Sequence, residues 1–376
     1  MSITLTASTW GEEEIRAIND VVATGRFSMG EKVAEFERQF AAYFGSQYAV
    51  MVNSGSSANL LMIAALVCSG KIKRGDEVIV PAVSWATTYA PLQQYGLRVK
   101  FVDTDVETLN FNVDALKNAI NANTKVVFCV NILGNPNDFN EVKKIIGARD
   151  IIMIEDNCES MGAMYRGKYA GTIGLMGSFS MFFSHHISTM EGGMVVTDDE
   201  KMYHYLLSLR SHGWTRHLPD KNHVSNKSDD DFTEMFRFVL PGYNLRPLEM
   251  SGAIGIEQLK KLPDLLDKRR INAENFQRVM WGHPAITQKQ IGQSSWFGFS
   301  MIFADRMKAM RALSKYNIEY RPIVAGDFTR NEVIRYFDCD VKYYAGAQVI
   351  NDHGLYIGNH GEYIDFSTLK MALDEI

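Results

Sequence analysis

A glycine between serines precedes an apolar run that is typical of a helix. The segment Val52–Leu60 reads VNSGSSANL, and the run LMIAALVC follows it. Small residues at a helix start leave backbone N–H groups free to face an anion, which the helix dipole also favours. Gly55 and Ser56 are therefore candidate ligands of an anionic group. The same residues would also suit an ordinary serine cap, so both interpretations stay open.

Two further segments follow apolar runs of strand character. Trp85 in VPAVSWATT comes directly after one of them, where α/β proteins place binding residues. Its indole either stacks on a flat ring or lies in the core. Asp156 and Glu159 follow the run IIMIE. A buried carboxylate needs a partner, so Asp156 predicts a cation such as a protonated pyridine nitrogen, unless the strand end is exposed.

A pair of histidines lies between a strand-like segment and a glycine turn. Gly177–Gly193 reads GSFSMFFSHHISTMEGG, with Ser180 in the strand-like part and His185 and His186 after it. No lysine occurs between Tyr169 and Glu200. Two adjacent histidines lack the i, i+4 spacing and the nearby carboxylate of a metal site, so we expect no metal here.

Two later loops combine polar side chains with glycine, tryptophan and proline. His212 and Arg216 lie in SHGWTR, and Asn244 and Arg246 lie in PGYNLRP. Such loops often carry binding residues. Taken singly, each of these side chains could equally form a surface ion pair.

The elements that must position these residues alternate between strands and helices, which predicts an α/β fold with a mostly parallel sheet. The expected strands are Val78–Pro81, Val99–Asp103, Val126–Val130, Ile151–Glu155, Phe179–Phe183 and Met194–Thr197. The pattern changes near residues 245–255, where a long helical segment begins. We therefore expect a large domain over residues 1–250 and a smaller α+β domain over 251–376, with a strand in Ser294–Phe303. The polar stretch Pro219–Asp231 predicts an exposed loop.

Composition excludes several classes of protein. The chain has 376 residues, 46% apolar and 22% charged, with a formal charge of −5, which argues against disorder and a nucleic-acid partner. No apolar run reaches the length of a membrane span. The four cysteines are scattered, so we expect neither disulfides nor a cysteine cluster. We expect a soluble protein of the reducing cytoplasm, without a signal peptide.

In their order along the chain, these motifs resemble those of a known enzyme family. The segments SGSSAN, PAVSWATT, EDNCES, SFS with EGG, and PGYNLRP resemble the pyridoxal phosphate (PLP)-dependent sugar aminotransferases of fold type I (DegT/StrS type), from about Ser8 to Arg321. The resemblance implies an aspartate aminotransferase-like large domain. In that family the pattern S-F-S-x₄-K-x₅-E-G-G contains the lysine that binds PLP covalently. Here that position holds His185.

This replacement implies a different reaction within the family. Imidazole cannot attach to the cofactor aldehyde as an amine does, but it can act as a general base. In the family, histidine here marks enzymes that remove the C3 hydroxyl from nucleotide-linked 4-keto-6-deoxyhexoses. One kind acts on a CDP-sugar and carries an iron–sulfur cluster. The nearest cysteines, Cys129 and Cys158, are 29 positions apart, so the resemblance favours the kind that acts on GDP-4-keto-6-deoxy-D-mannose, in the colitose and O-antigen branch of lipopolysaccharide synthesis.

The resemblance also implies roles for individual residues, with His185 as the catalytic base and His186 as its competitor. PLP or pyridoxamine phosphate (PMP) would be held without a covalent bond, and L-glutamate would donate the amino group. The implied cofactor ligands are Gly55, Ser56 and Ser180 at the phosphate, Trp85 on the ring, Asp156 at its nitrogen, Glu159 near its 3-hydroxyl, and Asn244 from a second subunit of a homodimer. The implied substrate contacts are His212 and Asn244 for glutamate, Arg216 and Arg246 for the sugar or diphosphate, Gly25, Arg26, Phe27 and Ser28 for the nucleotide sugar, and Glu319.

Three alternatives stay open. The first is an aminotransferase of the perosamine synthase kind that uses a lysine from elsewhere in the chain. The second is a CDP-sugar 3-dehydratase. The third is a non-catalytic sensor that has kept the fold.

Overall fold

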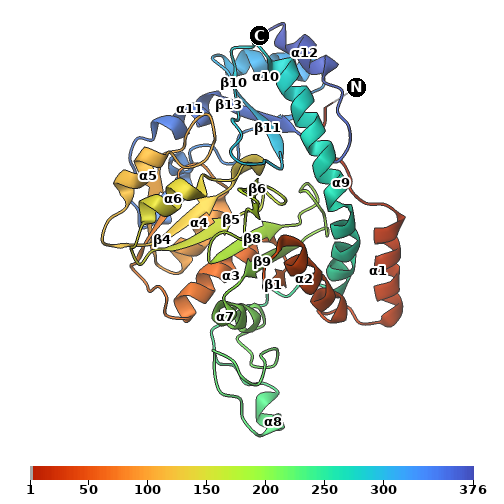
Figure 1. Cartoon of the computed structure of the whole chain (residues 1–376), viewed down its shortest axis with the longest axis vertical. Coiled ribbons are helices and arrows are strands. Elements are labelled where there is room, and N and C mark those ends of the chain that lie inside the picture. The colour runs from red at the N-terminus through yellow and green to blue at the C-terminus, as the bar shows by residue number, and fades with distance from the viewer. Residues whose placement is uncertain (1–2) are drawn as a thin grey trace.

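A seven-stranded sheet in the order β1-β9-β8-β5-β4-β2-β3 forms the centre of the molecule (Figure 1). The computed structural model describes residues 3–376. The strands of this sheet are β1 (Tyr48–Val52), β2 (Glu77–Pro81), β3 (Arg98–Val102), β4 (Thr124–Val130), β5 (Ile152–Asp156), β8 (Met176–Ser180) and β9 (Gly193–Thr197). Strands β3, β2, β4, β5 and β8 are parallel, and β9 lies antiparallel between β8 and β1. The predicted α/β class with a mostly parallel sheet is confirmed.

Helices cover both faces of this sheet, which explains why its strands read as continuous apolar runs. The helices of the large unit are α1 (Glu12–Thr24), α2 (Glu31–Phe44), α3 (Gly55–Cys68), α4 (Ala86–Gln94), α5 (Val113–Ala119), α6 (Phe139–Ile146), α7 (Glu200–Arg210) and α8 (Asp231–Glu234). Apolar side chains of α3, α4 and α7 pack on one face. On the other face, α2 and α9 (Glu249–Met280) cover the β1, β9 and β8 side, while α5 and α6 cover the rest.

A second, smaller sheet packs near the C-terminal half of α9 (Figure 1). Its order is β10-β11-β13-β12. The remaining elements are the strands β10 (Ile286–Thr287), β11 (Gly298–Ile302), β12 (Tyr320–Arg321) and β13 (Gly354–Gly358), the helices α10 (Arg306–Lys315), α11 (Ala345–His353) and α12 (Ser367–Leu373), and the hairpin β6 (Met164–Tyr165) and β7 (Lys168–Tyr169). Ile3 is buried in the core of this smaller unit with Phe276 and Phe299. The N-terminal residues therefore pack with the second unit, although they precede the first in sequence.

The strand expected over Phe179–Phe183 is wrong at both ends. Strand β8 begins at Met176 and ends at Ser180, and the chain then leaves the sheet as the β8–β9 loop (residues 181–192). Phe183 is 55% exposed. The apolar run predicted a buried strand, but hydrophobic periodicity cannot distinguish strand residues from apolar residues of the loop that follows the strand. The remaining expected strands of the large unit agree with the observed bounds to within two residues.

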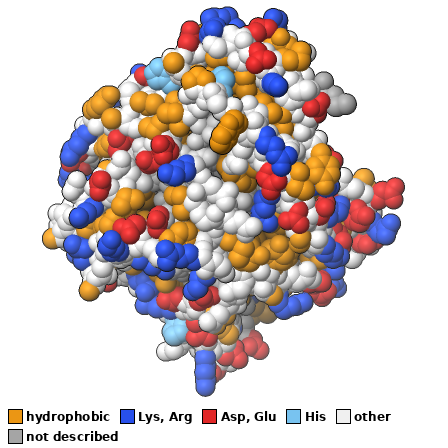
Figure 2. Space-filling model, turned by 45° about the horizontal axis from the view of Figure 1, so that its top comes forward, with side chains coloured by type: hydrophobic (Ala, Val, Ile, Leu, Met, Phe, Trp, Pro, Cys, Tyr) orange, Lys and Arg blue, Asp and Glu red, His pale blue; other side chains and the backbone are white. Residues whose placement is uncertain are grey.

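The sheet brings one end of several strands to the same edge. Strands β1, β2, β5 and β8 have the same direction, so their carboxyl ends lie together. This is the edge at which open α/β sheets bind ligands. Within residues 3–376, no helix combines the length and apolarity needed to cross a membrane. On the face shown in Figure 2, basic and acidic side chains are interspersed, which agrees with the small net charge.

Candidate active site

A cavity of about 370 Å³ opens at the carboxyl edge of the large sheet. Residues at or after the ends of five strands (β1, β2, β4, β5 and β8), the β8–β9 loop and the smaller unit form its wall. Of the side chains selected from the sequence, those that line it are Gly55, Ser56, Trp85, Asp156, Glu159, Ser180 and His185. These selected residues, which are separated by up to 130 positions in the chain, therefore meet in one site.

The start of α3 packs directly against the end of β8. A Cβ atom on Gly55 would lie 2.6 Å from the Ser180 Cβ and 2.9 Å from the Cys158 Sγ, so only glycine fits without movement. Ser54 caps the helix, because its hydroxyl accepts a hydrogen bond from the Ser57 N–H at 3.0 Å. Ser54, Gly55 and Ser56 all line the cavity, so the helix cap leaves room for an anion at the same point. Backbone N–H groups and hydroxyls at this point suit a phosphate.

Asp156 is a buried carboxylate with neutral partners only. It is 5% exposed, and its Oδ2 accepts hydrogen bonds of 2.7 Å from Asn59 Nδ2 and Thr88 Oγ1. Its Oδ1 accepts one from the Cys158 N–H at 3.2 Å. Among the described residues, no basic side chain forms an ion pair with Asp156. A carboxylate of this kind on a cavity wall suits a positively charged ring nitrogen.

Trp85 lines the same cavity as Asp156, at the N-terminal cap of α4. Its side chain is 59% exposed. The core interpretation of Trp85 is therefore wrong, and the indole is free to stack on a flat ring in the cavity.

Glu159 lines the same wall and holds its proton more strongly than an ordinary glutamate. Burial raises the pKa of Glu159, the nearby Asp156 carboxylate acts in the same direction, and the resulting pKa is about 7. The Leu133 N–H donates a 3.1 Å hydrogen bond to its Oε2 and acts in the opposite direction. Near neutral pH this side chain can therefore either donate or accept a hydrogen bond at a ring oxygen.

The two adjacent histidines lie in different surroundings. His185 lines the cavity, with its ring 5.1 Å from the Phe297 ring in an edge-on arrangement. Burial lowers the pKa of His185 to about 3, and the Arg269 cation contributes in the same direction, so the imidazole is neutral at pH 7. His186 is fully buried, and its Nε2 lies 3.2 Å from the Ser295 carbonyl oxygen. Of the pair, only His185 lines the cavity.

His212, Arg216, Asn244 and Arg246 form a second cluster, away from the cavity lining. They lie within the α7–α9 arm (residues 211–248), where His212, Arg216 and Arg246 approach the Trp214 ring. The guanidinium carbons of Arg216 and Arg246 lie 5.3 and 5.9 Å from the centre of the Trp214 ring system. The His212 ring lies 5.0 Å from it. Asn244 Oδ1 accepts a 3.0 Å hydrogen bond from Arg246 Nε.

The remaining predicted residues also lie outside the cavity lining. The segment Gly25–Ser28 follows α1, and the Phe27 carbonyl accepts a 3.0 Å hydrogen bond from the Glu249 N–H at the start of α9. Glu319 lies in the smaller unit, where its carboxylate accepts a 2.8 Å hydrogen bond from the Leu5 N–H.

Several lining residues were not selected from the sequence. Asn59 lies four positions after Gly55 on α3, so helical spacing could have placed it on the same face. Phe297 and Tyr356 come from the smaller unit, more than 100 residues after His185, and no local pattern connects them with the site. Glu191 of the EGG segment also lines the cavity.

The cavity offers an anion site, an aromatic face and a buried carboxylate along one wall, which is the set of groups that PLP requires. In residues 3–376, no three or more His, Cys, Asp or Glu side chains are placed to hold a metal ion. Residues 8–337 match the model of the DegT/DnrJ/EryC1/StrS aminotransferase family. The chain belongs to this family.

Individual members of the family show how far the likeness extends. A GDP-4-keto-6-deoxy-D-mannose 3-dehydratase of Yersinia pseudotuberculosis is 57% identical over 367 residues, which are 95% of this chain and 93% of the relative. A solved GDP-4-keto-6-deoxymannose-3-dehydratase, in a histidine-to-asparagine variant with bound GDP-perosamine, superposes with a TM-score of 0.96 at 55% identity and covers 99% of this chain and 100% of its own. Another, with a trapped PLP–glutamate geminal diamine, has the same score and identity and covers 99% of each chain.

Proposed function

We propose that this protein removes the C3 hydroxyl from GDP-4-keto-6-deoxy-D-mannose, with PLP and PMP as its cofactor forms and L-glutamate as co-substrate. The product is GDP-4-keto-3,6-dideoxy-D-mannose. The observation that carries the proposal is an imidazole, that of His185, on the cavity wall at the motif position of the family's lysine. The dehydratases that resemble the chain at 55–57% identity support the same reaction.

The cofactor, when bound as PMP, supplies an amine for the C4 ketone of the sugar and a ring that accepts electrons. Gly55, Ser56 and Ser180 bind its phosphate at the start of α3. Asp156 holds the proton of the ring nitrogen, and Trp85 stacks on the ring face. Glu159 hydrogen-bonds the 3-hydroxyl. These contacts replace the covalent anchor, and charge-assisted hydrogen bonds of about 1.5–3 kcal/mol each are strong enough in combination for retention.

His185 is the general base in this proposal. Its neutral imidazole accepts the proton from the cofactor C4′ while the C3 hydroxyl of the sugar leaves as water. With a lysine at this position, the amino group would be transferred to the sugar. Imidazole cannot support that transfer, so the nitrogen leaves as ammonia.

The reaction balances without a further oxidant or reductant. The sugar loses one oxygen and gains two electrons at C3, and glutamate loses the same two electrons as it becomes 2-oxoglutarate and ammonia. One water is released in the dehydration step, and one is consumed in the hydrolysis that frees ammonia.

In this proposal, the cluster around Trp214 in the α7–α9 arm contributes to the active site of a second copy of the chain. His212, Arg216, Asn244 and Arg246 present cationic and amide groups for anionic substrates, but they do not line the cavity of their own chain. A homodimer would bring this cluster to a partner's cavity, where Asn244 would reach the cofactor phosphate. Segment Gly25–Ser28, together with Glu319, would complete the contacts to the nucleotide sugar.

We propose that the protein acts in the cytoplasm. The cysteines Cys68, Cys129, Cys158 and Cys339 are all free thiols, as in proteins of reducing compartments.

The deciding experiment is incubation of the protein with PLP, L-glutamate and either GDP- or CDP-4-keto-6-deoxyhexose, followed by product mass spectrometry. Loss of one oxygen from the GDP-sugar without gain of nitrogen is the expected result. Gain of nitrogen would identify an aminotransferase. Turnover of the CDP-sugar alone would show that the substrate is a CDP-sugar and not a GDP-sugar. The absence of any turnover would favour a sensor. A lysine–pyridoxyl adduct after borohydride treatment would contradict the proposed role of His185.

His185→Asn tests that role directly. Removal of a general base costs about 10²- to 10⁴-fold in rate, while PLP binding should persist because the other contacts stay intact. His186→Asn is the matched variant of the neighbouring residue. If His186→Asn lost the dehydration step at an unchanged melting temperature while His185→Asn kept it, the base would be His186.

A further inference from the structure

The β8–β9 loop carries two of the residues that line the cavity, His185 and Glu191. It leaves β8 after Ser180 and returns to the sheet at Gly193. Hydrogen bonds within the loop connect its two ends, since the Met181 N–H donates to the Gly192 carbonyl and the Thr189 N–H donates to the Met181 carbonyl, at 2.9 and 3.0 Å. These bonds close the loop on itself but do not fix its direction relative to the cavity.

The middle of the loop is held from outside at Ser188. The Ser188 N–H donates a 2.9 Å hydrogen bond to Gln258 Oε1, and the Ser188 carbonyl accepts a 3.0 Å hydrogen bond from Trp10 Nε1. Both backbone groups of one loop residue are therefore bound by side chains from distant parts of the chain. Ser188 is three residues from His185 and three from Glu191, so its position sets both arms of the loop.

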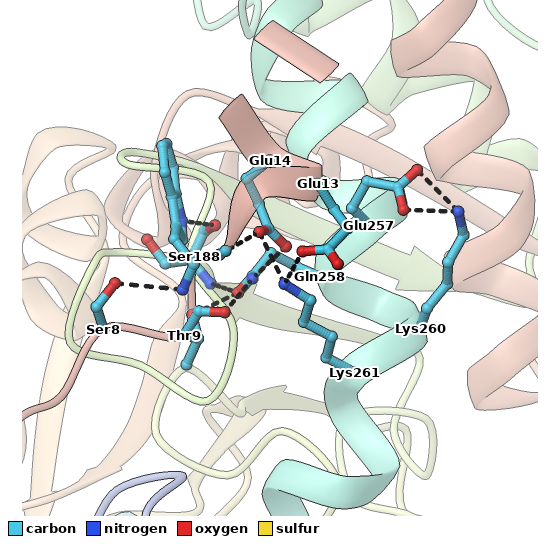
Figure 3. A network of polar contacts seen from close by, with 11 residues as sticks. Ser8, Thr9, Glu13, Glu14, Ser188, Glu257, Gln258, Lys260 and Lys261 are labelled. Atoms are coloured by element: carbon cyan, nitrogen blue, oxygen red, sulfur yellow. Dashed lines mark hydrogen bonds and ion pairs between the residues drawn. The ribbon is translucent and has the colours of Figure 1, made fainter. Parts of the chain in front are cut away.

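Gln258 uses its complete hydrogen-bonding capacity in this contact. Its Oε1 accepts a second hydrogen bond from Thr9 Oγ1, and its Nε2 donates to the Thr9 carbonyl and to Glu14 Oε1, at 2.6, 2.9 and 2.8 Å. Gln258 and Glu14 are both fully buried. Figure 3 shows the Gln258 side chain between Thr9, Glu14 and Ser188. Because a buried amide with four satisfied hydrogen bonds has one favourable orientation, the contact holds the Ser188 main chain in place, in addition to the contacts that Arg269 and Ser295 make with the two histidines.

The N-terminal side of this network is itself anchored. Glu14 accepts hydrogen bonds from the Gly11 N–H at 2.7 Å and from Lys261 Nζ at 2.8 Å (Figure 3). Lys261 lies one helical turn after Gln258 on α9, so the helix holds α1 and the loop with neighbouring side chains. Ile187 of the loop is buried among apolar residues of α9 as well.

We propose that Gln258 is a positioning residue for the dehydration reaction. It fixes the main chain of Ser188, and through it the placement of His185 at the cavity. The inference rests on the proposed function only in the choice of reaction. A displacement of about 1 Å of a catalytic group can cost about 10²-fold in rate, whereas the proposed cofactor contacts lie at the starts of α3 and α4, at the end of β5 and at Ser180 of β8, outside residues 181–192.

The test compares Gln258→Met with Glu257→Gln. Methionine keeps the length of the side chain and removes its polar group. Glu257 is the adjacent residue on α9, where it pairs with Lys260 and does not contact the loop. Trp10→Phe is a second variant, which removes only the Nε1–H donor to Ser188 and keeps the aromatic ring. Hydrogen–deuterium exchange of residues 185–191, PLP affinity from absorbance titration, and kcat are measured for each protein.

Gln258→Met and Trp10→Phe should each speed exchange in residues 185–191 and lower kcat by about 10- to 100-fold. PLP affinity should change less than about threefold, and Glu257→Gln should match the wild type. Faster exchange with normal kcat would show that loop placement does not matter for the reaction. Unchanged exchange, or PLP affinity that falls together with kcat, would also overturn the proposal. If the wild type itself does not dehydrate the GDP-sugar, the proposed function fails, and the exchange data still report on the contact.

Discussion

Arg269 donates a hydrogen bond to the main-chain carbonyl of His185, with 3.5 Å between Nη2 and the oxygen. Arg269 is 2% exposed, and its Nη1 donates to the carbonyls of Trp296, Phe297 and Asn359. Within residues 3–376 it forms no ion pair with a carboxylate. A buried cation without a counter-charge therefore lies directly behind the proposed base. It contributes, after burial, to the low pKa of His185.

The first prediction concerns the pH dependence of kcat. Replacing the cation in Arg269→Gln should raise the pKa of His185, whereas Arg269→Lys keeps a positive charge there. Since only the neutral imidazole can accept a proton, the acid limb of the kcat profile should move to higher pH in Arg269→Gln. Arg269→Lys should stay near the wild type. An identical acid limb in all three proteins would mean that Arg269 does not act on the base. Circular dichroism at each pH controls for unfolding.

The second prediction concerns acid stability. The pKa of His185 is about 3 in the folded protein, because of burial first and Arg269 second, against 6.5 for an ordinary histidine. Between these two values the unfolded chain binds a proton at this position that the folded chain does not bind, so the free energy of unfolding falls as the pH falls. The stability is complete above pH 6.5. The melting temperature should therefore decline less steeply below pH 6.5 in His185→Asn than in the wild type, and parallel curves would contradict this.

The third prediction concerns retention of the cofactor. Asp156→Asn keeps the shape of the side chain but removes the charge that faces the ring nitrogen. Loss of one charge-assisted hydrogen bond of about 1.5–3 kcal/mol should weaken PLP binding by roughly 10- to 150-fold. Absorbance titration with PLP measures this directly. Cys158→Ser, a change next to the phosphate site that carries no charge, is the control and should bind PLP almost normally. Equal binding by Asp156→Asn and wild type would exclude the proposed pairing.

The fourth prediction concerns assembly. The α7–α9 arm projects from the body with α8 at its far end (Figure 1), and it exposes Phe232, Phe236 and Phe238 at 81%, 67% and 55%. Exposed apolar side chains in one place mark an interaction surface. Phe236→Ser combined with Phe238→Ser should shift the protein from dimer to monomer in analytical ultracentrifugation and abolish turnover. Trp281→Ser, a change at an exposed aromatic at the C-terminal end of α9 and outside the arm, provides the comparison. A wild type that sediments as a monomer with full activity would refute the dimer.

The part of the site that sequence could predict is the part that follows strand ends. Continuous apolar runs located β2 and β5, and residues at or just after the ends of parallel strands share one edge of the sheet. This is why Trp85 and Asp156 were found, whereas Ser180 was selected through the family resemblance. Gly55 was recognised for a related reason, because a small residue at a helix start allows close approach.

Residues that reach the site through packing between the two units could not be predicted in this way. Phe297 and Tyr356 belong to the smaller unit, and their role depends on how that unit sits on the larger one. The cluster around Trp214 shows the opposite case. Its members were recognised singly, but only the fold shows that Arg216 and Arg246 share one aromatic ring and lie away from the cavity. Local patterns record the environment of a residue along its own element and not across the molecule.

The place of β1 in the sheet has a consequence for the order in which the chain folds. Strand β1 lies at the sheet edge, and its neighbour there is β9, almost 150 residues later. On a ribosome, residues 48–52 must therefore wait unpaired until residue 197 has been made and has left the exit tunnel. Contacts of such long range form slowly, since a large loop must close first. Gly55 packs against Ser180 of β8, so the proposed phosphate site can form only after about half of the chain has been synthesised.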